Sequence, residues 1–320
     1  MDGDDRALPT THTAPRQERE LKSPDRVLLS FAVLVVIWGY SWIILKLGLE
    51  YAGPVTFAAQ RTFFGAIVLL AMLALTGRRF LPTRLAETLL LGVIQTTVFV
   101  ALAQWSLVEG GVGRSAVLVF TMPFWTVLFA SFVLGERVFA LQRWAIVVAA
   151  CGLIVIVEPW QLGGSIKSKS IAVAAGAAWA AGTVLVKRIQ SRAPIDPVAL
   201  TAWQMLFGSL ILVAMAIMVD EPATTWDPRF IAILSFTAVI STGLAWVVWL
   251  TLLQRLSAGI ASMGMLAVPV FAIAASAYHL GERFSANETL GMGLIVIALI
   301  ILSSAALRQR RAAERATTRE

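Results

Sequence analysis

Charged residues, cysteine and histidine are all scarce in this sequence. Of its 320 residues only 14% are charged, whereas a soluble domain carries about a quarter. A single cysteine, Cys151, excludes an intrachain disulfide, and with only two histidines no cluster of metal ligands is available. These shortages argue against a soluble domain and against a metal centre, and we expect no cofactor.

Apolar residues are abundant instead. They make up 58% of the chain, and the mean hydropathy is +0.79, which indicates a membrane protein. The net charge is +7, but the basic residues gather in the two tails and in short loops rather than along one element with interleaved aromatic residues. The sequence therefore predicts a lipid bilayer, and no nucleic acid, as a partner.

Ten apolar segments follow one another, each close to the roughly 20 residues that a membrane-spanning helix needs. We expect these helices over residues 27–47, 54–75, 86–107, 114–134, 140–158, 170–189, 198–219, 230–252, 258–280 and 286–306. Residues 1–26 are predicted to form a disordered tail without a cleavable signal peptide, residues 159–169 an external linker, and residues 307–320 a basic tail.

The basic residues between these segments predict the orientation of the chain. If the N-terminus is cytoplasmic, 19 of the 26 lysines and arginines lie inside and 5 outside, which leaves Lys46 and Arg61 within the apolar segments. This bias favours cytoplasmic positions for both termini and an even number of spans.

The chain also contains an internal repeat. Trp38 and Lys46 in "WGYSWIILK" recur 141 residues later as Trp179 and Lys187 in "WAAGTVLVK". Two further pairs match: "GPVTFAAQRTFFG" with "DPVALTAWQMLFG", and "PFWTVLFASFVLGER" with "PVFAIAASAYHLGER".

Each copy, 27–158 and 170–306, has five predicted spans. An odd number means that the second copy enters the membrane from the opposite side. The sequence therefore predicts an all-α membrane protein of ten transmembrane helices arranged as two inverted five-helix repeats, a common architecture of secondary transporters.

These motifs carry a family resemblance over about residues 27–306. The "WGYSW" start and the paired Pro…Gly-Glu-Arg elements resemble the EamA-type drug/metabolite transporter superfamily. The resemblance implies a permease of the bacterial inner membrane that exports amino acids or other small metabolites through a central cavity. It leaves open the substrate, the oligomeric state and whether transport is coupled to protons.

Aromatic and small residues on two matching helix faces are the first candidates for a substrate site. Trp38, Ser41 and Trp42 share one face, and Trp179 and Thr183 lie on the equivalent face of the sixth span. A tryptophan at mid-depth needs a partner for its indole N–H or a cavity. Ordinary helix packing is the alternative interpretation.

Polar residues in the apolar segments are the second set of candidates, because unpaired amides and charges are unfavourable in hydrocarbon. The set comprises Gln60, Arg61, Gln95 and Gln204, together with Phe99 on the span of Gln95 and Trp246 on the eighth span. Interhelical hydrogen bonds that serve only packing would explain the amides equally well.

Arg61 has two interpretations. Its guanidinium either binds a substrate carboxylate through two hydrogen bonds or has a structural partner, which is Glu109 near the external end of the third span or the backbone carbonyls at a helix end. Pro123 and Pro269, each about ten residues into a span, are predicted to bend their helices and to act in gating.

Two other classes of protein compete with a transporter. A membrane-embedded enzyme would need a nucleophile, a base or a metal site converging at one depth, and His279 lacks such a partner in the sequence. A structural membrane protein without transport would not require polar groups in both copies of the repeat. We therefore expect no enzymatic activity and a small-molecule substrate.

Overall fold

The computed structural model describes residues 24–77, 81–82, 84–136, 138–158, 165–192, 195–246, 248–249 and 267–317, and all regular secondary structure in these ranges is helical. The tail before residue 24, the segment 250–266 and the end of the chain after 317 lie outside the described residues. So do parts of the predicted linker, of the eighth and ninth spans and of both tails.

Within the described ranges, eight helical segments are long and apolar enough to cross a membrane. They are Leu29–Gly48, Pro54–Leu75, Leu85–Val108, Val112–Val133, Ala140–Val157, Ile166–Gln190, Pro197–Met218 and Ala286–Ala305. Two shorter apolar helices, Pro228–Leu244 and Ala267–Leu280, fall in the predicted eighth and ninth spans. The chain is therefore an all-helical protein that passes through the membrane several times.

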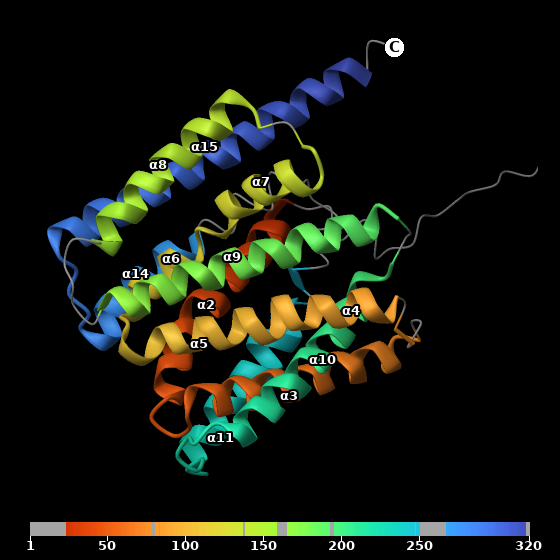
Figure 1. The fold of residues 1–320 in the computed structure, drawn as a ribbon, viewed down its shortest axis with the longest axis vertical. Helices are drawn as coiled ribbons and strands as arrows, with labels where there is room; N and C mark the ends of the chain where they lie inside the picture. The colour runs from red at the N-terminus through yellow and green to blue at the C-terminus, as the bar shows by residue number, and fades with distance from the viewer. Residues whose placement is uncertain are drawn as a thin grey trace, which may run out of the picture.

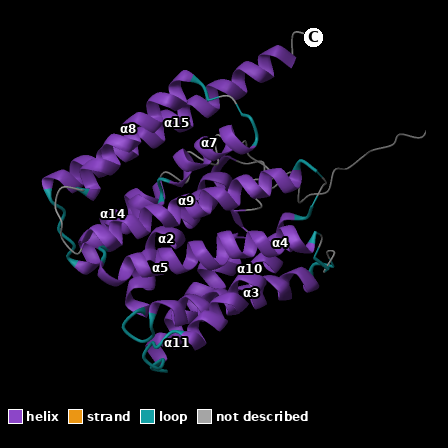
Figure 2. Cartoon of the chain, viewed as in Figure 1, coloured by secondary structure: helices purple, strands orange, loops and turns teal. Residues whose placement is uncertain are grey.

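Short loops join the helices (Figure 2), and the sequence sets several helix starts. Pro54, Pro197 and Pro228 stand at the first positions of α3 (Pro54–Leu75), α10 (Pro197–Met218) and α11 (Pro228–Ser235), where a missing N–H is harmless. The Asp196 carboxylate accepts hydrogen bonds from Val198 N and Ala199 N and so caps α10.

Two helices extend beyond their predicted ends. The first, α2 (Pro24–Gly48), begins inside the predicted N-terminal tail, and α15 (Ala286–Thr317) continues through most of the predicted C-terminal tail. Alanine and arginine are good helix formers, so the run "AALRQRRAAERAT" extends the last apolar helix.

The helices pack in pairs (Figure 1). At one edge α15 lies along α8 (Ala140–Val157), and at the opposite side α3 packs on α10. Between them, α9 (Ser165–Gln190) contacts α5 (Phe99–Glu109), α6 (Val112–Val119) and α7 (Met122–Val133), while α2 contacts α14 (Ala267–Leu280). The first helices of the two sequence copies, α2 and α9, thus lie between these two outer pairs.

The predicted third and eighth spans each contain a π-helical segment, η1 (Gly92–Val98) after α4 (Leu85–Leu91), and η2 (Phe236–Leu244) after α11. In each segment a threonine hydroxyl bonds the carbonyl five residues back: Thr97 Oγ1 to Gly92 O at 3.5 Å and Thr242 Oγ1 to Thr237 O at 2.8 Å. Such π-segments interrupt regular helices and recur at functional sites.

Glycines allow the two π-segments to approach the neighbouring helices closely. A Cβ on Gly65 of α3 would lie 2.7 Å from Thr242 Cγ2, and a Cβ on Gly208 of α10 would lie 2.4 Å from Gly92 O. Gly65 and Gly208 occupy matching positions in the two sequence copies. Only a residue without a side chain permits these contacts.

Candidate functional site

Four of the predicted site residues meet in one aromatic cluster in the middle of the bundle. The Trp246 ring lies 6.3 Å from the Trp38 ring and 5.9 Å from the Trp179 ring, measured between centroids. Phe99 approaches Trp179 edge-on at 4.7 Å, and Trp249 packs against Trp38 at 6.0 Å. The cluster therefore combines residues of α2, α5, α9 and the chain that follows η2.

Trp38 and Ser41 bind the π-segment η2. Trp38 Nε1 donates to the Ser241 carbonyl at 3.0 Å, and the hydroxyls of Ser41 and Ser241 lie 2.7 Å apart. Ser41 Oγ also donates to Ile37 O of its own helix at 2.5 Å. The indole N–H at this depth thus has a protein partner.

Gln95 occupies the other side of the cluster. It lies on η1, is 8% exposed, and packs over Gly182 of α9, where an added Cβ would lie 2.8 Å from Gln95 Cβ. Phe99 is one turn beyond Gln95, and Trp179 is one turn before Gly182, so the two pairs of residues meet across the same helix contact.

Three predicted site residues lie apart from the aromatic cluster or bond elsewhere. Trp42 is 8% exposed and packs in the main apolar core with residues such as Ile43 and Ala103. Gln60 Nε2 donates to Thr224 Oγ1 at 3.0 Å, in the loop between α10 and α11. Thr183 Oγ1 donates to the Trp179 carbonyl one turn back.

Arg61 and Gln204 each leave a buried polar atom without a hydrogen bond among the described residues: Arg61 Nε and Gln204 Oε1. Arg61 lies on α3 one turn before Gly65, which contacts the π-segment η2 at Thr242. The position of Arg61 on α3 is therefore close to η2, the segment that is bonded to Trp38 and Ser41. The side chain of Glu109, its predicted alternative partner, is outside the described residues, so that pairing stays a prediction.

Pro123 and Pro269 lie at matching positions of the sequence repeat, in α7 and α14. Pro123 is the second residue of α7, which follows α6 after the break at Phe120 and Thr121. Pro269 is the third residue of α14, and the preceding segment is not described. Pro123 thus occupies the first turn of α7, where its missing N–H is tolerated, and the break before it interrupts the predicted fourth span.

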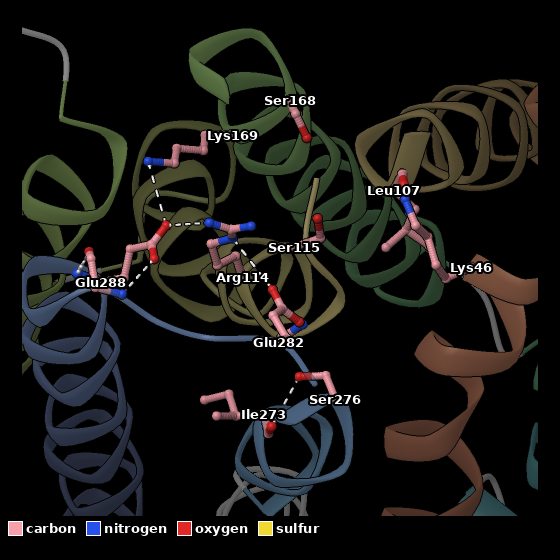
Figure 3. Close-up of polar contacts among 12 residues, drawn as sticks. Lys46, Leu107, Arg114, Ser115, Ser168, Lys169, Ile273, Ser276, Glu282 and Glu288 are labelled. Carbon is pink, nitrogen blue, oxygen red and sulfur yellow. Dashed lines mark hydrogen bonds and ion pairs between the residues drawn. The ribbon is translucent and has the colours of Figure 1, made fainter. Parts of the chain in front are cut away.

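The structure also contains a charged network at the predicted external side (Figure 3). Arg114 Nη1 lies 2.7 Å from Glu288 Oε1, and Arg114 Nε lies 3.4 Å from Glu282 Oε1. Lys169 Nζ lies 3.9 Å from Glu288 Oε1 and 3.7 Å from Glu158 Oε2. The network thereby joins three carboxylates, those of Glu158, Glu282 and Glu288, to the cations Arg114 and Lys169.

This external network also fixes helix ends. Glu282 Oε2 accepts from Gly113 N at the start of α6, and Ser285 and Glu288 form a reciprocal capping box at the start of α15. Glu136, which matches Glu282 in the repeat, instead pairs with the exposed Lys187 at 3.1 Å. The Ser-x-x-Glu spacing before an apolar run was a sequence signal for the capping box, whereas the pairs with Arg114 and Lys169 had none.

Lys46, in contrast, binds backbone. Its ammonium group donates to the carbonyls of Leu107 and, at 3.1 Å, Val108 at the end of α5. A cation there complements the negative end of the helix dipole. The contact explains a basic residue in the last turn of α2 without a substrate.

Known proteins resemble this chain over most of its length. The model of the EamA-like transporter family matches the chain twice, over residues 26–158 and 167–304. The chain is 30% identical to the "Uncharacterized transporter YvbV" of Bacillus subtilis, over 90% of this chain and 95% of that protein. It is 28% identical to the "Probable amino-acid metabolite efflux pump" of Escherichia coli K12, over 84% of this chain and 92% of the relative.

A solved crystal structure that is 17% identical shares the fold, with a TM-score of 0.61 over 89% of this chain and 99% of its own. The family match covers most of the chain in two successive copies, at nearly the same residues as the predicted repeats. The predicted resemblance is thereby confirmed. This chain is a multi-pass membrane protein that belongs to the EamA-like transporter family.

Proposed function

We propose that this protein is a secondary transporter of the bacterial inner membrane that exports amino acids or related small metabolites. Transport proceeds by alternating access through the centre of the bundle, with both termini in the cytoplasm. The observation that carries this proposal is the aromatic cluster, in which Trp38 from one sequence copy and Trp179 from the other both contact Trp246. Small-molecule sites combine aromatic walls with a few polar groups in this way.

Matched contacts support two inverted repeats. Gly65 of α3 contacts Thr242 of η2, and at the matching positions Gly208 of α10 contacts η1, where Thr97 Oγ1 donates to Gly208 O at 2.9 Å. The pair of α2 with α14 is likewise matched by the pair of α9 with α7. In each of these pairs a helix of one copy packs against a helix of the other copy, and the matching pair has the two copies exchanged. A two-fold axis in the membrane plane produces this packing.

The aromatic cluster joins the two sequence copies, because Trp246 contacts both Trp38 and Trp179. A substrate that enters between these rings separates Trp246 from Trp38 or from Trp179. Helices interrupted by π-segments can rearrange at modest energy, because their hydrogen bonding is already irregular. The two π-segments beside the cluster are accordingly the proposed moving parts, with Pro123 and Pro269 as further bends.

Amino acids are the proposed substrate class for two reasons. The relative from Escherichia coli bears the name of an amino-acid metabolite efflux pump, and the aromatic and amide groups of the centre suit a small amphipathic solute. Arg61, whose buried Nε has no hydrogen bond within the described residues, stays a candidate for a further polar contact with the substrate.

Counterflow in proteoliposomes tests the transport function. Liposomes that contain the purified protein are loaded with one unlabelled amino acid, and uptake of the same labelled amino acid is followed for each of the common amino acids. We expect transient accumulation of at least one amino acid above that in protein-free liposomes. Absence of accumulation for all of them would contradict amino-acid transport.

A further inference from the structure

Trp38 and Trp179 occupy matching positions in the two sequence copies, but their surroundings differ in hydrogen bonding. We define the Trp38 side as Trp38, Ser41 and Ser241, and the Trp179 side as Trp179, Gly182 and Gln95. We infer that the Trp179 side alone binds the polar end of the substrate, a planar oxygen acceptor such as a carboxylate. This inference rests on the proposed transport function.

The Trp38 side is already satisfied by the protein. Trp38 Nε1 donates to Ser241 O at 3.0 Å, and the Ser41 and Ser241 hydroxyls lie 2.7 Å apart. These bonds join α2 to η2. A substrate that bound here would have to break these bonds. The buried Ser241 carbonyl and the Trp38 indole N–H would then need new hydrogen-bond partners.

The Trp179 side has no equivalent bonds. The sequence replaces Ser41 by Gly182, and the position of Ser241 is taken by Thr96. Among the residues that the structure describes, neither the Trp179 indole N–H nor the Gln95 side-chain amide has a hydrogen-bond partner. An indole N–H and an amide at this depth need one, because hydrocarbon and aromatic rings supply no comparable acceptor.

Gln95 and Trp179 lie on adjoining turns of the contact between η1 and α9. Gln95 packs directly on Gly182, one turn from Trp179, and the rings of Phe99 and Trp179 are 4.7 Å apart. The glycine lets the amide approach α9 closely and fixes its position. The indole N–H and the amide NH₂ are both hydrogen-bond donors, and they lie beside a wall of two aromatic rings.

This chemistry selects the ligand. Two neutral donors bind an oxygen acceptor, and two neighbouring donors match the two oxygens of a carboxylate. The aromatic wall accommodates the apolar part of the same molecule. The Trp38 side then acts as a scaffold that positions Trp246 across the site.

Two substitutions that retain shape test this assignment. Trp179→Phe removes the indole N–H but keeps a ring against Phe99, and Gln95→Leu keeps the packing on Gly182 but removes the amide. With an amino acid that the parent carries in counterflow, each variant should raise the KM about 3- to 10-fold, as expected for one lost hydrogen bond. Trp144→Phe is the matched control, because Trp144 is 65% exposed on the peripheral helix α8; its KM should equal that of the parent.

Thermal unfolding without substrate supplies a second, independent readout. Trp38→Phe should lower the Tm because it breaks the bond to Ser241, whereas Trp179→Phe should lower it by clearly less because no protein bond is lost. A parent without counterflow would contradict the transport function, while the order of the two Tm values would still test the asymmetry. The inference is overturned if Trp179→Phe lowers the Tm as much as Trp38→Phe, or if Trp179→Phe and Gln95→Leu both keep the parental KM.

Discussion

Arg114 on α6 and Glu288 on α15 form an ion pair in which 2.7 Å separate Nη1 from Oε1. The pair joins the two sequence copies at the predicted external side, since α6 belongs to the first copy and α15 to the second. Glu288 is 5% exposed, so its carboxylate depends on Arg114 and Lys169 for compensation.

Neutralising this arginine should destabilise the protein. Arg114→Gln leaves the Glu282 and Glu288 carboxylates with less compensating positive charge. We expect the free energy of unfolding to fall by about 1–3 kcal/mol, which is less than for a fully buried pair because the Arg114 side chain is 29% exposed. Thermal unfolding in detergent measures the loss. Arg229→Gln, at an exposed position on the same predicted side, is the control. Equal Tm values for the two variants would contradict a stabilising role for the network.

Close packing at Gly208 gives a second prediction. Gly208→Ala places a methyl group 2.4 Å from the Gly92 carbonyl oxygen, so η1 and α10 must move apart. We expect the free energy of unfolding to fall by about 1–3 kcal/mol and transport to be impaired. Gly293→Ala on α15 is the matched control, because nothing lies within 4 Å of its Cβ position. It should leave the Tm unchanged or raise it slightly. A normal Tm for Gly208→Ala would refute the close approach.

The two interpretations of Arg61 predict different substrate profiles. If its guanidinium binds a carboxylate, Arg61→Gln should reduce transport of amino acids about tenfold or more and spare their neutral analogues, because only the former lose a charge-assisted bond. If Arg61 pairs with Glu109, all solutes should be affected alike, and Arg61→Gln combined with Glu109→Gln should recover much of the loss. Counterflow with paired acids and amides distinguishes the outcomes.

Inverted topology can be tested by labelling from either side of the membrane. In a Cys151→Ser background, Ala140→Cys should react only with reagents on the cytoplasmic side and Arg283→Cys only with reagents on the external side. Both positions are exposed, and Arg283 avoids Ser285, whose hydroxyl caps α15. Labelling of both cysteines from the same side would rule out inverted repeats.

The sequence predicted the helices well because an apolar run of membrane-spanning length has few other solutions. The structure brings together four aromatic candidates, Trp38, Phe99, Trp179 and Trp246. Trp38 and Trp179 could be chosen from the sequence because the repeat places them on matching helix faces.

The sequence did not predict the partners of these residues. Hydropathy contains no signal for a π-segment, so the bond from Trp38 to the Ser241 carbonyl could not be anticipated. Trp42 shares a helix face with Trp38, yet it packs in the main core, because the side-chain position depends on the neighbouring helix. Ion pairs such as Arg114 with Glu288 join residues 174 positions apart, and composition alone cannot pair them.

Protection of a cysteine by substrate tests the central claim, that a transported solute occupies the Trp179 side of the cluster. In a Cys151→Ser background that retains counterflow, Gln95→Cys is treated in proteoliposomes with a small maleimide, with and without a saturating amino acid that this variant still transports. We expect the labelling rate of Gln95→Cys to be several-fold slower when the amino acid is present, and the rate at the control site Ala140→Cys to stay unchanged. Labelling of Gln95→Cys at the same rate with and without the transported amino acid would contradict the claim.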